Sequence, residues 1–82
     1  MSRTWFITGA SRGLGAAIAQ AALAAGDSVV VSARRLEQLE QFVAQAPEQT
    51  LAVELDVTRE DQAAAAVEAA ITRFGRIDVL VN

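Results

Sequence analysis

The sequence predicts an α/β fold built on a doubly wound parallel sheet, and its 82 residues correspond to the N-terminal half of that sheet. Apolar, β-branched runs alternate with stretches whose apolar residues recur at helical spacing, which gives the order βαβαβαβ. A glycine-rich turn joins the first strand to the first helix. Strands that alternate with helices imply right-handed crossovers, and the doubly wound arrangement places the strands in the order 3-2-1-4.

The first strand and the first helix flank the glycine-rich turn. Residues 4–8 are expected to form a strand, because β-branched and aromatic side chains precede a glycine there. Residues 13–25 are expected to form a helix that is apolar nearly all round, so it should pack closely against the sheet. Gly26 is expected to end this helix as a C-terminal cap.

The middle of the chain contains the second and third strands. Ser28–Ala33 is a continuous β-branched run, typical of a strand that is buried on both faces. Apolar residues then recur at helical spacing, so residues 35–45 are expected to form a helix with a charged outer face, ended by Pro47. Residues 50–55 are expected to form the third strand.

The last part of the chain contains the third helix and the fourth strand. Thr58 and Asp61 have the spacing of a capping box, which predicts a helix over residues 63–74. Gly75 is expected to cap the end of that helix. Residues 77–81, which are apolar except for Asp78, are expected to form the fourth strand.

Composition excludes several classes of protein. A net charge of −3 without a basic stripe disfavours nucleic acid and anionic membranes as partners. The sequence has no cysteine and no histidine, so we expect neither a disulfide framework nor a metal site. It shows no signal-peptide pattern and no apolar run long enough to span a membrane, so we expect a cytoplasmic location.

The glycine-rich turn is the candidate for a ligand site, because it stands between a strand and a helix. One of its three glycines lets the chain leave the strand, one lets the backbone approach a diphosphate, and one lets the helix pack against the sheet. The start of the helix offers unpaired N–H groups and a positive dipole end to an anion. The P-loop signature G-K-[S/T] is absent, which excludes a P-loop nucleotide hydrolase.

Thr8 followed by G-x-x-x-G-x-G resembles the corresponding segment of the short-chain dehydrogenase/reductase family. The resemblance implies that residues 1–82 are a partial Rossmann dinucleotide-binding domain, which ends before the catalytic half, and that the turn holds the pyrophosphate of NAD or NADP. The alternative is that the glycines serve helix–sheet packing alone. The residues of the turn expected to bind the cofactor are Gly9, Ser11, Arg12, Gly13, Leu14 and Gly15.

The end of the second strand favours NADP over NAD. An NAD site usually places a carboxylate there to accept hydrogen bonds from the ribose, but the first acidic residue here is Glu37. Arg34 stands at the strand end instead, and its planar guanidinium suits the oxygens of a 2′-phosphate. Arg12 could approach the same phosphate from the other side. The alternative is that Arg34 and Arg35 are solvated charges at a helix start, although cations are electrostatically misplaced there.

Three further residues support the resemblance. Asp56 and Val57 follow the third strand at the carboxyl edge of the sheet, where ligands bind, and the resemblance implies contact with adenine. The alternative is that Asp56 caps the next helix, but Thr58 is the better cap and would leave Asp56 available. Asn82 matches the first asparagine of the family's N-N-A-G motif, which lines the cofactor site and steadies the sheet.

The resemblance implies an NADP-dependent oxidoreductase that transfers a hydride between nicotinamide and a small carbonyl or alcohol substrate. The family's catalytic serine and Tyr-x-x-x-Lys pair have no match, and the sequence has no tyrosine and no lysine, so we expect no catalytic residue and no activity from these residues alone. Two alternatives remain open, a non-catalytic nucleotide-binding module and a half-fold that self-associates through the apolar strand 77–81. A homo-oligomer is expected.

Overall fold

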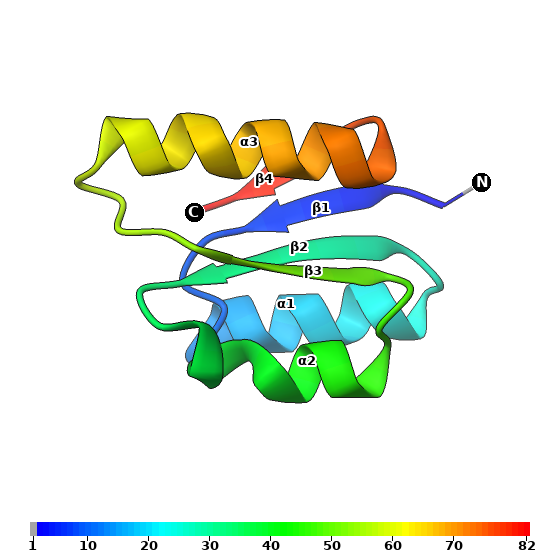
Figure 1. The fold of residues 1–82 in the computed structure, drawn as a ribbon. Coiled ribbons are helices and arrows are strands. Elements are labelled where there is room, and N and C mark those ends of the chain that lie inside the picture. Colours follow the sequence, from blue (N-terminus) through cyan, green and yellow to red (C-terminus); the bar gives the residue numbers. More distant parts are fainter. Residues whose placement is uncertain (1) are drawn as a thin grey trace.

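The computed structural model describes residues 2–82 and shows a parallel sheet with helices on both faces (Figure 1). Helices α1 and α2 cover one face of the sheet, and α3 covers the other. In chain order the elements are β1 (Thr4–Ile7), α1 (Gly13–Ala24), β2 (Ser28–Ala33), the 3₁₀ turn η1 (Leu36–Leu39), α2 (Glu40–Gln45), β3 (Thr50–Glu54), α3 (Glu60–Phe74) and β4 (Val79–Val81).

The strand order among the described residues is β3-β2-β1-β4, with every pairing parallel, which confirms the predicted Rossmann-like topology. Ile7 pairs with Val31 of β2 and with Val81 of β4, so the carboxyl ends of the strands lie along one edge. The segments that follow the four strands therefore meet at this edge.

Strand β2 is buried on both faces and explains the continuous apolar run in the sequence. Val29 and Val31 pack on the face covered by α1 and α2, together with the fully buried Leu39 of η1 and Phe42 of α2. Val30 points to the opposite face and packs beneath α3. Side chains alternate across a strand, so three consecutive buried valines, Val29–Val31, fit a sheet that is covered on both sides.

The predicted helix over residues 35–45 was wrong in its first turn, which is the 3₁₀ turn η1 followed by the short helix α2. Arg35 is extended, and the N–H of Gln38 donates to the carbonyl of Arg35 at 3.2 Å. Leu39 and Phe42 are both fully buried and stand three residues apart. Leu36, at the start of the 3₁₀ turn, is 45% exposed, and short 3₁₀ turns are frequent at the N-terminal ends of α-helices.

The predicted capping box was also wrong, because α3 begins at Glu60 and its N-cap position is Arg59. Thr58 is engaged elsewhere, since its hydroxyl donates to Asp56 Oδ1 at 2.6 Å and its N–H donates to the same oxygen at 2.9 Å. Asp56 thus closes a tight Asx turn, in which a side chain competes with the helix for the backbone. Gly75 ends α3 in the left-handed conformation, as predicted.

Strands β1, β3 and β4 are each shorter than predicted by one or two residues. At the start of β4, Asp78 already bonds to β1, because its N–H donates to the carbonyl of Thr4 and its carboxylate accepts from the N–H of Thr4. Within residues 2–82, no helix combines the length and the apolar character needed to cross a membrane.

Candidate functional site

The turn after β1 has a fixed shape. Gly9 and Gly13 have φ values of 65° and 67°, in the left-handed region that residues with a Cβ rarely adopt. Between them Ala10 is fully buried, and its N–H donates to the carbonyl of Ser32 in β2 at 3.0 Å. The hydroxyl of Ser32 in turn donates to the carbonyl of Ile7. The turn is therefore tied to both central strands.

Gly15 is the glycine that allows α1 to lie against the turn. A Cβ at this position would lie 2.7 Å from the carbonyl oxygen of Gly9 and 3.3 Å from the Cα of Ala10. Both atoms belong to the backbone, so they could not yield by changing a rotamer. Two of the three predicted glycine roles are thus visible, since Gly9 and Gly13 supply the left-handed conformation and Gly15 allows close packing. The approach of the backbone to a diphosphate stays a prediction.

The first turn of α1 suits an anion. Its N-cap residue Arg12 is extended and makes no side-chain capping hydrogen bond within the described chain. The first turn also contains no acidic residue. The first N–H groups of a helix have no partner inside the helix, and the macrodipole adds positive potential at that end. This arrangement is typical of helix starts that bind phosphate.

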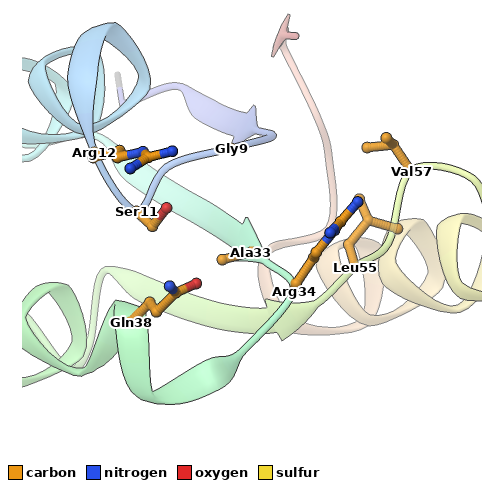
Figure 2. Close-up of a pocket in the computed structure, with 8 residues that line it drawn as sticks. All are labelled: Gly9, Ser11, Arg12, Ala33, Arg34, Gln38, Leu55 and Val57. Carbon is orange, nitrogen blue, oxygen red and sulfur yellow. The ribbon is translucent and has the colours of Figure 1, made fainter.

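A cleft of about 640 Å³ opens beside the turn at the carboxyl edge of the sheet (Figure 2). Arg12 stands on one wall and Arg34 on another, and none of the described residues that line the cleft is acidic. Cations of this kind attract phosphate oxygens, and a guanidinium can bind two of them at once. The residues that line this cleft are Gly9, Ser11, Arg12, Ala33, Arg34, Gln38, Leu55 and Val57.

A second cleft of about 400 Å³ continues from the first toward β4 and shares Gly9, Arg12 and Val57 with it. At its far end the hydroxyl of Thr8 donates to the carbonyl of Val81 at 3.2 Å. The residues that line this cleft are Thr8, Gly9, Arg12, Leu14, Gly15, Ile18, Val57, Val81 and Asn82. The two clefts together follow the strand ends from β3 to β4.

Most of the residues singled out from the sequence line these clefts. They are Gly9, Ser11, Arg12, Leu14, Gly15, Arg34, Val57 and Asn82. Gly13 does not line either cleft and acts through the conformation of the turn.

Asp56 also lies outside the lining of both clefts. The hydrogen bonds from the Thr58 hydroxyl and N–H lower the pKa of its carboxyl, and the positive charges of Arg34 and Arg59 act in the same direction. The inference that Thr58 caps the helix and leaves Asp56 free was therefore wrong. Contact between Asp56 and adenine stays a prediction.

Several lining residues were not anticipated. Ala33 and Leu55 line the first cleft. Ala33 is the last residue of β2 and precedes Arg34, and Leu55 follows β3 and precedes Asp56. Their position at a strand end was the available signal. Gln38 had no such signal, because the sequence placed it inside a regular helix, whereas it lies in the 3₁₀ turn η1.

Comparison with known proteins gives a consistent result. A family model described as short chain dehydrogenase matches residues 3–82. An oxidoreductase of Botryotinia fuckeliana is 52% identical over the whole chain, which covers 30% of that relative's length. The chain thus spans about a third of the length of this curated relative.

Solved structures agree with the sequence comparison. A short-chain dehydrogenase from Streptomyces avermitilis superposes with a TM-score of 0.95 at 46% identity, covering 100% of this chain and 30% of that one. A 3-ketoacyl-(acyl-carrier-protein) reductase from Brucella melitensis, solved with NADH, gives 0.89 at 35% identity over 95% of this chain and 32% of that one. A metagenomic short-chain oxidoreductase, solved with NADP, gives 0.86 at 33% identity over 98% and 38%. Both nicotinamide dinucleotides thus occur among the similar structures.

Proposed function

This chain belongs to the short chain dehydrogenase family, and from that membership we propose that it forms the cofactor-binding segment of an NADP-dependent oxidoreductase. The whole protein would transfer a hydride between nicotinamide and a small carbonyl or alcohol substrate. The cofactor supplies the hydride chemistry when bound, and the residues described here bind and orient it.

The observation that carries the preference for NADP is the charge of the first cleft. Arg12 and Arg34 line it, and no acidic side chain is among its described lining residues. A carboxylate at this place would accept hydrogen bonds from ribose hydroxyls and repel a 2′-phosphate, whereas arginine attracts the phosphate. Glu37, the first acidic residue after β2, does not line the cleft in the described structure.

The rest of the cofactor would follow the same edge of the sheet. The N-terminus of α1 suits the pyrophosphate, because its N–H groups have no capping side chain in the described chain. Leu14 is 77% exposed and lines the second cleft with Asn82, which would give the nicotinamide end an apolar wall and an amide. Proton transfer would be supplied by other parts of the whole protein, since these residues include no tyrosine, lysine, histidine or cysteine.

The affinities of the native protein for NADPH and NADH test the proposal. We expect NADPH to bind at least about tenfold more tightly, because a charge-assisted hydrogen bond to phosphate contributes that much or more. Isothermal titration calorimetry at low and high salt measures both cofactors. The ratio of NADPH affinity to NADH affinity should fall as the salt concentration rises, because salt screens exposed charges.

Two results would count against the proposal. Equal affinity for the two cofactors, at low salt as well as high, would remove the assignment of the 2′-phosphate to the arginine-lined cleft. Tight binding without oxidation of NADPH by any member of a panel of aldehydes and ketones would favour the non-catalytic nucleotide-binding module.

A further inference from the structure

Gln38 is a polar, uncharged residue that lines the first cleft. Its side chain lines that cleft together with Ser11, Arg12 and Arg34. Figure 2 shows its carboxamide extending from η1 into the space beside Ala33, on a different wall from Arg34. Gln38 therefore faces the part of the cleft that the proposed function gives to the ribose 2′-phosphate.

The backbone around Gln38 is held in place. Its N–H donates to the carbonyl of Arg35 at 3.2 Å, which closes the 3₁₀ turn. The next residue, Leu39, is fully buried in the core beneath β2. Because the buried Leu39 anchors the turn, the backbone that carries Gln38 has a fixed position beside the cleft.

Residues 36–40, which comprise η1 and the first residue of α2, present different side chains to the first cleft and away from it. The segment reads Leu-Glu-Gln-Leu-Glu, and among the described lining residues only the uncharged Gln38 reaches the first cleft. Glu40 instead lines a separate apolar hollow beside Ala52, and Glu37 lines neither. A carboxamide offers an N–H donor to a phosphate without repelling it, which a glutamate of the same shape could not do.

We propose that Gln38 is a specificity-determining residue whose carboxamide donates a hydrogen bond to a ribose 2′-phosphate held by Arg12 and Arg34. The inference rests on the proposed preference for NADP and adds a third residue that would bind the 2′-phosphate. The two arginines attract a phosphate through their charge, and Gln38 contributes a neutral donor on a third side.

Two substitutions test this role in the native protein. Gln38→Glu keeps the shape and replaces the donor with a carboxylate, so NADPH affinity should fall about 10- to 100-fold while NADH affinity changes less than about threefold. Gln38→Met removes the amide without adding charge, so NADPH affinity should fall about three- to tenfold. Gln38 is exposed at the surface, so neither variant should disturb folding.

Gln45→Glu is the matched control, because it makes the same change of charge at an exposed position outside the first cleft. It should leave both affinities unchanged. Titrations with adenosine 2′,5′-bisphosphate and adenosine 5′-monophosphate locate the effect, since only the first carries the 2′-phosphate. The loss caused by Gln38→Glu should appear with the bisphosphate alone.

The outcomes separate this inference from the proposed function. If Gln38→Glu lowers the affinities for NADPH and NADH alike, or lowers neither, the role of Gln38 is overturned. A loss of NADPH affinity alone in an Arg34 variant would still support the NADP proposal. If the unmodified protein binds the bisphosphate no more tightly than the monophosphate, both proposals fall together.

Discussion

Arg34→Asp is expected to weaken NADPH binding by about 100-fold while NADH affinity stays the same or improves. Arg34 lines the first cleft, which has no acidic side chain among its described residues. The substitution removes a charge-assisted hydrogen bond and places a carboxylate where the 2′-phosphate would lie. The same carboxylate can accept from the 2′- and 3′-hydroxyls of NADH, so the preference should reverse.

A control is needed because Arg34 also acts on the neighbouring loop, where its charge helps to lower the pKa of Asp56. Arg34→Gln removes the charge without adding another carboxylate, and should cost NADPH about tenfold. Arg59→Asp makes the same charge reversal at a position that does not line the cleft, and should leave both affinities unchanged. A similar response of NADPH and NADH to Arg34→Asp would show that the 2′-phosphate site is misassigned.

Gly15→Ala is expected to abolish measurable binding of both cofactors and to lower the free energy of unfolding by about 1–3 kcal/mol. The new Cβ would lie 2.7 Å from the carbonyl oxygen of Gly9, so either the turn or α1 must move. Movement of either one separates the helix N-terminus from the cleft that would hold the rest of the cofactor. NADPH and NADH share the pyrophosphate, so they should be lost together.

Gly75→Ala separates this effect from general destabilisation. Gly75 has a φ of 81°, and the described structure has nothing within 4 Å of a Cβ placed there. Alanine at this position costs about 1 kcal/mol or more in backbone strain, at the opposite end of α3 from the cleft. Urea unfolding should therefore show a loss for both variants, and titration should show lost binding for Gly15→Ala alone. Normal cofactor binding by the Gly15 variant would contradict the role given to this turn.

The topology and the conformation of the glycine-rich turn were predictable because each follows from patterns that are visible in the sequence. Continuous β-branched residues in β2 and alanine-rich helical spacing in α1 admit few alternatives, and the strand order follows from right-handed crossovers. Likewise, the need for glycine at positions 9, 13 and 15 is visible in the sequence as a spacing between a strand and a helix.

The details that were not predicted depend on competition between interactions. Thr58 could cap α3 or bond to Asp56, and the sequence does not show that the second arrangement is adopted. Residues 36–39 form a 3₁₀ turn and not the first turn of an α-helix, and the apolar spacing in the sequence fits both, because residues three apart share a face in either. The position of Gln38 at the cleft is a consequence of that turn, so it became visible only in the structure.

A crystal structure of the native protein with NADP tests the central claim most directly. The account predicts that the pyrophosphate lies at the first turn of α1 and that the 2′-phosphate lies within hydrogen-bond distance of the Arg34 guanidinium. A 2′-phosphate that points to solvent, away from both Arg12 and Arg34, would contradict the NADP assignment. A cofactor bound away from the Gly9–Gly15 turn would contradict the account as a whole.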